Sequence, residues 1–366
     1  MAEQADSVCV VSQEEEPAKK TNILQKLGNV VSGVFDYLND VDTTYIRPQE
    51  FNWAAMAEMN SYIESYKLKS ESGQEIVFSP ENRTKIGPYA GWRWAFLGYT
   101  FDIKNFSSPS AKDWSFCFYT PICSIDLIWR KSSDNYKIRK VSLLKDVDAL
   151  TFENLSLKGM ETAVRGVDVQ YVFNHRKFSY PAAFAQSSCQ KKSAGSPILG
   201  LGYVYHRLKI DHNELSTTLV DAVVKKLPSI KDYIELDTTI RFNKLELGAL
   251  TVSGGYAYNY VPMKNLLLSG SVTAGISFKK AFSDIESESF SYRDFKINNV
   301  NFDGCGRFAI VYNNMRWFVG CSTIWHYYSY TRDQFHTSNA LGSISLYAGL
   351  NFHRRKEFRS KSKSIW

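Results

Sequence analysis

The chain has 366 residues, of which 22% are charged and 14% are aromatic, and its formal net charge is +7. Its mean hydropathy is −0.29, and no apolar run approaches the ~18–20 residues that a membrane-spanning helix needs, which excludes a helical membrane protein. The basic residues are spread along the chain and form no stripe on one element, so we expect no nucleic-acid partner.

The first 42 residues precede any strand pattern. Residues 1–20 are polar and acidic and predict a disordered N-terminal segment. Residues 21–42 place apolar side chains three and four positions apart and predict an amphipathic helix, on the periplasmic side of the exported domain described next. We favour packing of this helix on the rim of that domain, while contact with the membrane or with a periplasmic partner stays open. The start of the sequence shows no secretory signal, so we expect that a signal was removed or lies upstream.

Residues 43–353 alternate between apolar and polar side chains, which is the pattern of β-strands. The hairpin 249–260 and 265–279 shows the pattern best, with Leu250 on an apolar face and Thr251 on a small, polar face. Both strands exceed the soluble average of about 5–6 residues and reach the about 9–11 residues that cross a bilayer. The predicted strands are 52–70, 74–90, 92–103, 113–119, 122–130, 160–176, 198–211, 249–260, 265–279, 303–312, 316–328 and 342–353.

Two all-β folds fit such strands. A soluble β-sandwich would pack the apolar face of the hairpin on a second sheet. A membrane barrel would turn that face toward lipid and keep the small polar face inside, and the high aromatic content suits the girdles at its two interfaces. We predict an antiparallel transmembrane β-barrel of about 12 strands over residues 43–353, followed by a basic C-terminal tail over residues 354–366.

The lengths of the connections favour the barrel, because outer-membrane barrels have short turns on one side and long loops on the other. Short turns are predicted at 120–121, 262–264 and 313–314. Long outer loops are predicted at 104–112, 131–159, 212–248, 280–302 and 329–341, with a short helix that ends near Pro228. Segment 177–197 is the exception, since it is long but lies on the short-turn side. We expect it to fold against the barrel mouth or into the lumen.

Four phrases of the sequence resemble one protein family. They are VDTTYIRPQEFNW (41–53), KIGPYAGWRWAFLGYTFDIK (85–104), FNHRKFSYPAAFAQSSCQKKSAGS (173–196) and GGYAYNY (254–260). The family is an uncharacterised one, a domain of unknown function, of predicted outer-membrane β-barrels from Bacteroides-type Gram-negative bacteria. The resemblance implies a location in the bacterial outer membrane and supplies no activity. We therefore expect outer-membrane lipid, lipopolysaccharide and the barrel-insertion machinery as partners. The strand that ends on Phe352 resembles the recognition strand of barrel insertion, although the chain continues beyond it.

Strand alternation places a set of polar side chains inside the predicted barrel. If the apolar positions of each strand face lipid, the intervening polar positions face the lumen. They form either a structural network that pairs charges and fills a small barrel, which we favour, or a lining that selects solutes. The candidate lumen-lining or ligand-binding residues are Asp102, Asp126, Arg130, Asp168, Gln170, Asn174, His206, Asn259 and Arg307.

The stretch FSYPAAF in segment 177–197 is a separate candidate. Its proline and aromatic side chains fit a rigid loop that packs on itself. They fit a lumen plug that narrows or gates a pore equally well. The candidate plug residues are Phe178, Tyr180, Pro181 and Phe184.

Catalysis is not expected. No catalytic or metal-binding motif occurs, so we predict neither a cofactor nor a metal. Ser322 and His326 share a strand face but stand about 13 Å apart, too far for a nucleophile and its base, and we expect His326 in a surface aromatic girdle. Cys117 and Cys123, and Cys305 and Cys321, flank predicted tight turns, where free thiols are favoured over strained disulfides.

The predicted function is that of an outer-membrane barrel, most simply a pore or uptake component for a small solute. An alternative is a surface protein that does not transport and binds a partner or a glycan through its outer loops. An outer-membrane acyl hydrolase is the remote alternative.

Overall fold

The computed structural model describes residues 40–92, 95–98, 101–102, 112–133, 136–143, 149–228, 237, 244–282, 300–332 and 335–359. The predicted disordered segment 1–20 lies outside the described residues. So do nearly all of the predicted helix 21–42 and the end of the basic tail. Residues from Asp40 onward form one compact unit.

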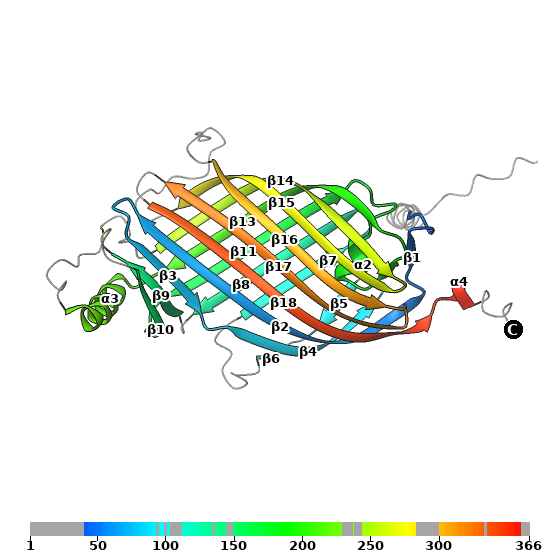
Figure 1. Ribbon diagram of the computed structural model, residues 1–366, viewed down its shortest axis with the longest axis horizontal. Coiled ribbons are helices and arrows are strands. Elements are labelled where there is room, and N and C mark those ends of the chain that lie inside the picture. The colour runs from blue at the N-terminus through cyan, green and yellow to red at the C-terminus, as the bar shows by residue number, and fades with distance from the viewer. Residues whose placement is uncertain are drawn as a thin grey trace, which may run out of the picture. The chain divides into compact units, whose positions relative to one another are not determined.

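One antiparallel sheet contains 16 strands and dominates the fold (Figure 1). A second, two-stranded sheet pairs β1 with β12. The strands are β1 Ile46–Pro48, β2 Phe51–Ser70, β3 Glu75–Pro80, β4 Arg83–Trp92, β5 Ala95–Gly98, β6 Phe101–Asp102, β7 Lys112–Tyr119, β8 Cys123–Ser133, β9 Tyr136–Ser142, β10 Leu150–Leu157, β11 Glu161–Val172, β12 Ser188–Gln190, β13 Ala194–Lys209, β14 Lys244–Met263, β15 Leu266–Phe282, β16 Val300–Asn313, β17 Trp317–Arg332 and β18 Phe335–Arg354. The helices are α2 Tyr180–Phe184, α3 His212–Lys226 and α4 Lys356–Arg359.

The main ladder runs in the order β10-β9-β3-β2-β18-β17-β16-β15-β14-β13-β11-β8-β7, and β4 pairs with β2, β5 and β6. The sheet curls round, because Arg307 of β16 forms an ion pair with Asp126 of β8 although four other strands separate them in the ladder. Among the described residues no ladder joins β7 to β5 or β6. The turns between β7 and β8, between β14 and β15 and between β16 and β17 lie at one end of the strands, here called the turn end. The opposite end, from which α3 follows β13, is called the loop end.

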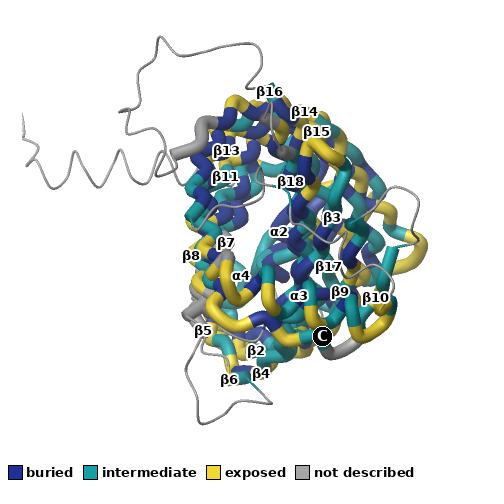
Figure 2. Tube along the Cα trace, turned by 90° about the vertical axis from the view of Figure 1, so that its left-hand side faces the viewer, coloured by how far each residue is buried: buried dark blue, intermediate teal, exposed yellow. Residues whose placement is uncertain are grey.

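Burial alternates along the strands in the opposite sense to a soluble protein (Figure 2). On β14 the outward side chains of Leu250, Val252 and Tyr256 are 40%, 48% and 54% exposed, whereas Ala257 and Asn259 point inward and are fully buried. Large apolar side chains outside and small or polar ones inside are typical of a barrel surrounded by lipid. In the described part of the chain, no second sheet covers the outward face, so a sandwich does not form.

The loop end departs from the predicted strands. Segment 131–159 was expected to be a loop but contains β9 and β10, and β3 pairs with β9. Segment 329–341 was also expected to be a loop, yet β17 and β18 stay paired as far as Arg332 and Phe335. The reason lies on the outward face, where Ser329, Thr331, His336 and Ser338 are polar, so the apolar alternation disappears although the ladder continues.

A smaller difference concerns the predicted strand 74–90. It is divided into β3 and β4, whose pairing with β2 shifts by one position around Pro80. Predicted strand 92–103 is likewise divided, into β5 and β6. The predicted helix within 212–248 is α3, where the Asp211 side chain accepts hydrogen bonds from the backbone N–H groups of Asn213 and Glu214.

Apolar side chains pack on the inward face of the curled sheet at the loop end. Val164, Val204 and Leu341 point inward from β11, β13 and β18 and meet side chains of β3, β9 and α3 in one core. The core residues that β3, β9 and α3 contribute include Phe78, Ile138, Leu215 and Leu219, all at most 1% exposed. The core therefore joins β18 to β11 and β13, which lie far apart in the ladder. Among the described residues, no helix is both long and apolar enough to cross a bilayer.

At the turn end, a buried carboxylate ties the two ends of the described chain together. Glu50 accepts hydrogen bonds from Arg47 at 2.5 Å and from Arg354 at 2.7 Å. Burial alone would raise the pKa of Glu50, but the two guanidinium hydrogen bonds outweigh it and lower the pKa from its ordinary value near 4.5. The stabilisation is therefore present above that value and is lost as the pH falls through the lowered folded value.

We expect Glu50→Gln to reduce the free energy of unfolding by about 1–2 kcal/mol at pH 7, since both arginine partners are partly exposed. The difference should shrink at a second, acidic pH that is low enough to protonate the wild-type carboxylate as well. Urea unfolding in detergent at the two pH values measures both. Glu71→Gln, in an exposed turn, is the matched control and should change little. A difference that does not depend on pH would contradict the role of the ionised carboxylate.

Candidate functional site

A cluster of buried charges spans the interior of the curled sheet. Asp126 and Asp168 stand opposite each other on β8 and β11, so their carboxylates need a cation nearby. Arg307 supplies it from β16, with Nη2 at 2.5 Å from Asp126 Oδ2 and 3.7 Å from Asp168 Oδ2. Arg307 is only 1% exposed. Its ion pairs join two walls of the barrel through the interior.

Two further ion pairs lie on the inward face. Lys279 Nζ contacts Asp303 Oδ1 at 2.5 Å, and both side chains are buried. Asp303 also accepts hydrogen bonds from Thr251 and Ser277. These groups come from the adjacent strands β14, β15 and β16, so this cluster stabilises one wall.

The other ion pair joins Arg130 of β8 to Glu64 of β2, at 2.7 Å. Arg130 also lies 4.7 Å from the centroid of the Tyr62 ring, and Tyr66 donates a hydrogen bond to Glu64. Because β2 and β8 are distant in the main ladder, this pair also crosses the interior.

A histidine that the sequence placed on the surface is inside. His326 was expected in an exposed girdle, but the inward positions of β17 are the even-numbered ones, and Trp325 and Tyr327 carry the girdle instead, at 38% and 48% exposed. His326 stands opposite Cys305 across the β16–β17 ladder. Its ring also stacks on Tyr328 at 5.9 Å.

The cysteines with described side chains are all free, namely Cys123, Cys189, Cys305 and Cys321. Cys305 pairs in register with His326, whereas Cys321 pairs with Ile310, five positions further along β16. The two cysteines also point to opposite faces of the sheet, so they cannot bridge. Cys117 lies outside the residues whose side chains are described.

Segment 177–192, here called the inner segment, fills the turn end (Figure 1). Its helix α2 begins after Ser179, whose side chain accepts a hydrogen bond from the Ala182 N–H. Phe178, Tyr180 and Pro181 are buried. Phe184 is half-buried and stacks on Tyr119 of β7 at 5.9 Å.

Polar side chains of the wall hold the inner segment in place. Asn259 of β14 donates hydrogen bonds to Ser179 O at 2.9 Å and to Gln190 Oε1 at 3.1 Å. The Tyr347 hydroxyl of β18 accepts from Gln186 at 2.8 Å and donates to Ala183 O at 3.2 Å. Two strands that are separated by three others in the ladder are thus attached to the same segment.

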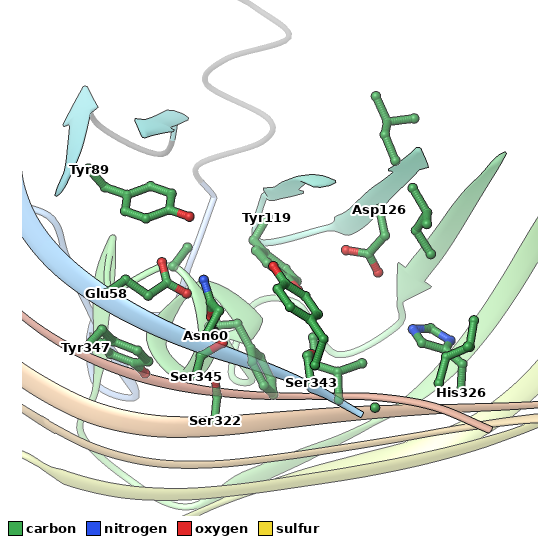
Figure 3. A pocket seen from close by; sticks show the side chains of 18 of the residues that line it. Glu58, Asn60, Tyr89, Tyr119, Asp126, Ser322, His326, Ser343, Ser345 and Tyr347 are labelled. Carbon is green, nitrogen blue, oxygen red and sulfur yellow. Dashed lines mark hydrogen bonds between the residues drawn. The ribbon is translucent and has the colours of Figure 1, made fainter. Parts of the chain in front are cut away.

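A cavity of about 230 Å³ lies between the inner segment and the charge cluster. Its walls come mainly from β2, β8, β17, β18 and α2, and combine apolar side chains such as Met56, Phe184 and Ile324 with polar ones. Figure 3 shows Glu58, Asn60 and Tyr89 gathered on one side, with Asp126 and His326 on the other.

Two carboxylates that line this cavity can accept further hydrogen bonds, as judged from the described part of the chain. Glu58 forms no ion pair there, and its polar neighbours Asn60 and Ser345 are uncharged. Asp126 gives one oxygen to Arg307, while its Oδ1 atom is buried and has no partner among the described residues. The cavity therefore combines apolar walls with a surplus of negative acceptors, which suits a solute that carries hydrogen-bond donors.

A family model described as "Domain of unknown function (DUF4421)" matches residues 40–352. The chain belongs to the DUF4421 family. No curated protein matches it. The described residues contain no group of three or more histidine, cysteine or acidic side chains that could hold a metal ion.

Three solved structures similar to this DUF4421 chain are outer-membrane proteins. The outer membrane protease OmpT from Escherichia coli has 7% identity and a TM-score of 0.35, over 82% of this chain and 97% of the other. The β domain of the Bordetella autotransporter BrkA has 10% identity and a TM-score of 0.31, over 82% and 100%. OprG from Pseudomonas aeruginosa has 10% identity and a TM-score of 0.25, over 84% and 98%. Similarities of this size assign no function to the DUF4421 chain.

The structure brings only some of the predicted lumen residues together. Asp126, Asp168 and Arg307 form the central cluster, and Gln170 joins it through a 2.8 Å hydrogen bond to Asp168. Arg130 lies beside it, paired with Glu64. The remaining predicted residues lie elsewhere in the barrel: His206 packs on Tyr328, Asn259 holds the inner segment and Asp102 stands opposite Lys85.

One predicted lumen residue is misplaced. Asn174 was expected to continue the inward face of β11, but β11 ends at Val172 and Asn174 lies in the following turn. Its side chain donates to Gly195 O at 2.8 Å and its backbone N–H donates to Ser196 Oγ. Asn174 therefore stabilises the turn, because strand alternation no longer applies once the chain leaves the ladder.

Sequence reasoning missed five functional-site residues of this DUF4421 chain. Strand alternation could have placed all of them on inward faces, because each lies an even number of positions from a residue on the inward face of its own strand. Glu58 and Glu64 share the face of Asn60 on β2, Lys279 shares that of Ser277, and Asp303 and Cys305 share that of Arg307. The missing information was which strands meet across the lumen.

Proposed function

We propose that the chain spans the outer membrane of a Gram-negative bacterium of Bacteroides type, with its turn end in the periplasm and its loop end outside. A belt of outward apolar side chains supports this placement, including Leu201, Val252, Val272, Ile310 and Val319, each 48–60% exposed. Insertion by the barrel-insertion machinery and closure of the wall between β7 and β5–β6 belong to the same proposal.

Inside this barrel, the geometry favours binding of a solute over a permanently open pore. The apolar core occupies the loop end and the inner segment occupies the turn end. The cavity between them, with its spare carboxylate Glu58, is the observation on which the proposal rests. We propose an uptake component that holds a small amphiphilic solute and releases it when the inner segment moves.

The charge of the cavity narrows the class of solute. Asp126 and Arg130 are each engaged in an ion pair, whereas Glu58 is not. A solute with a protonated amine next to an apolar or aromatic part would pair with Glu58 and pack against Phe184 and Met56. The cavity is smaller than the 300–1,000 Å³ of common ligand sites, so the solute is small.

We expect the purified chain to bind phenethylamine more tightly than 2-phenylethanol, and 2-phenylethanol more tightly than phenylacetate. Glu58→Gln should weaken phenethylamine binding by about tenfold and leave 2-phenylethanol almost unchanged, since it removes charge but little volume. Calorimetry in detergent measures the three affinities.

The matched control is Ser343→Ala, which alters the cavity wall without changing its charge. It should preserve the order of the three affinities. Equal affinity of phenethylamine for the wild type and for Glu58→Gln, with both proteins folded, would show that Glu58 does not bind the amine of the solute.

Other functions remain distinguishable by simple measurements. A steady conductance of the wild-type chain in a planar bilayer would favour an open pore instead. Binding of a glycan or protein that survives Glu58→Gln would favour a surface receptor acting through its loops. We propose that the chain is not a hydrolase, because Ser322 and His326 lie four residues apart on one strand, about 13 Å. Labelling of Ser322 by a serine-reactive phosphonate would contradict this.

A further inference from the structure

A group of basic side chains lies on the outward face near the loop end. Lys131, Arg165, Arg207 and Lys209 surround the small Ala163 and are here called the basic niche. Ala163 pairs in register with Lys131 on β8 and with Arg207 on β13. Together with Trp129, Glu161 and Thr162 these residues enclose a surface cavity of about 150 Å³. Three adjacent strands thus build one site, with Ala163 leaving room at its centre.

The basic niche stands at the upper border of the apolar belt. Further along the same strands toward the turn end, the outward side chains of Leu127, Leu201 and Tyr203 are 44%, 56% and 47% exposed. Trp129 lies at the border itself, 53% exposed, with the Arg165 guanidinium 4.5 Å from its ring. Tryptophan and tyrosine collect at the level of lipid headgroups, where one side is apolar and the other wet. The niche therefore lies at headgroup depth on the outer side.

The charges of the niche are largely unneutralised by the protein. Arg207 pairs with Glu246 at 2.6 Å, and Lys244 contacts the same carboxylate at 3.1 Å. Among the described residues, no ion pair forms at Lys131, Arg165 or Lys209, and Glu161 is the one acidic side chain that lines the cavity. A cavity with several cations and one carboxylate attracts a group with more than one negative charge, and the arginine fork matches phosphate oxygens.

We propose that the basic niche binds the phosphate of a lipid headgroup in the outer leaflet, of the lipopolysaccharide class. Arg165, Lys209 and Lys131 contact the phosphate oxygens, while Trp129 packs on the sugar or the first carbons of the acyl chains. A phosphorylated glycolipid fits this position because its charge and its apolar part match the niche and the belt below it. The proposal depends on the membrane placement and not on the interior cavity.

The test uses the full chain in detergent and bisphosphorylated lipid A as the probe. Native mass spectrometry measures the affinity of the wild type and of Arg165→Ala/Lys209→Ala. We expect at least about tenfold weaker binding by this variant. The matched control, Lys69→Ala/Lys140→Ala, removes two lysines from other strands at the same end and should keep the wild-type affinity. The conservative variant Arg165→Lys/Lys209→Arg should keep most of it.

Two comparisons identify the source of the phosphate. Dephosphorylated lipid A should bind at least tenfold more weakly than the phosphorylated form, and inorganic phosphate at equal concentration should not displace the lipid. Equal binding of the dephosphorylated lipid, or displacement by inorganic phosphate, would overturn the proposal. So would equal losses in the niche variant and the control. If Arg165→Ala/Lys209→Ala fails to fold, as judged by heat-modifiable migration, Lys131→Ala decides on the same criteria.

Discussion

Arg307→Met is expected to lower the free energy of unfolding by about 3–5 kcal/mol, one of the two largest effects that the structure predicts. The substitution keeps an unbranched aliphatic stem but removes the guanidinium, and so leaves Asp126 and Asp168 facing each other in the interior without their cation. A buried carboxylate without a partner is strongly destabilising, and here two are left together. Urea unfolding of the chain in detergent, followed by tryptophan fluorescence, measures the loss.

The matched control is Arg316→Met, which makes the same change in an exposed turn and should stay within about 0.5 kcal/mol of wild type. Adding Asp126→Asn to Arg307→Met should recover part of the loss, because it removes one of the two stranded charges. An Arg307→Met protein as stable as Arg316→Met would mean that the cluster does not hold the walls together.

Release of the inner segment should expose the interior to water. The variant Asn259→Ala/Tyr347→Phe removes four buried hydrogen bonds that join this segment to β14 and β18. At about 1 kcal/mol or more for each pair, the open population should rise by about tenfold or more. Cys305, which faces the interior, reports on this opening when it is the sole cysteine and a charged, water-soluble maleimide is the reagent.

The comparison variant disturbs buried hydrogen bonding at the other end of the strands. Tyr136→Phe/Thr162→Val removes a buried hydrogen bond between β9 and β11 near the loop end and leaves the inner segment untouched. If the inner segment is a gate, labelling of Cys305 should accelerate only in the Asn259→Ala/Tyr347→Phe protein. Equal labelling rates in both folded variants would instead make the inner segment a fixed part of the core.

The sequence predicted the alternating part of the wall well, because the two faces of each strand meet different environments. Leu250 and Thr251 had to point to different environments, and the whole hairpin followed from that alternation. Beyond the apolar belt, toward the loop end, the two faces of a strand are either both polar or both apolar. There the predictions were wrong, as for β9 and for the paired ends of β17 and β18, because hydrogen bonding between strands continues without any hydrophobic pattern.

The site was harder to predict than the wall. Parity placed Asp126, Asp168 and Arg307 on inward faces, but contact between β8 and β16 depends on how far the sheet curls. A single strand carries no information on that curvature. Asn174 was placed on an inward face because strand alternation does not indicate where a strand ends. His326 was misplaced because its aromatic neighbours Trp325 and Tyr327 suggested a girdle, although they occupy the opposite face.

The pairing of β18 with β2 has a consequence for biogenesis. Their ladder runs from Phe335 opposite Ser70 to Arg354 opposite Phe51. β2 therefore cannot pair with β18 until almost the entire polypeptide has been synthesised. During that interval both β2 and β17 present bare backbone edges, which pair readily with other chains. On the proposed route to the outer membrane, a nascent chain therefore needs a chaperone that covers these edges. A truncation that deletes only the final strand should yield aggregates or proteolytic fragments instead of a smaller folded sheet.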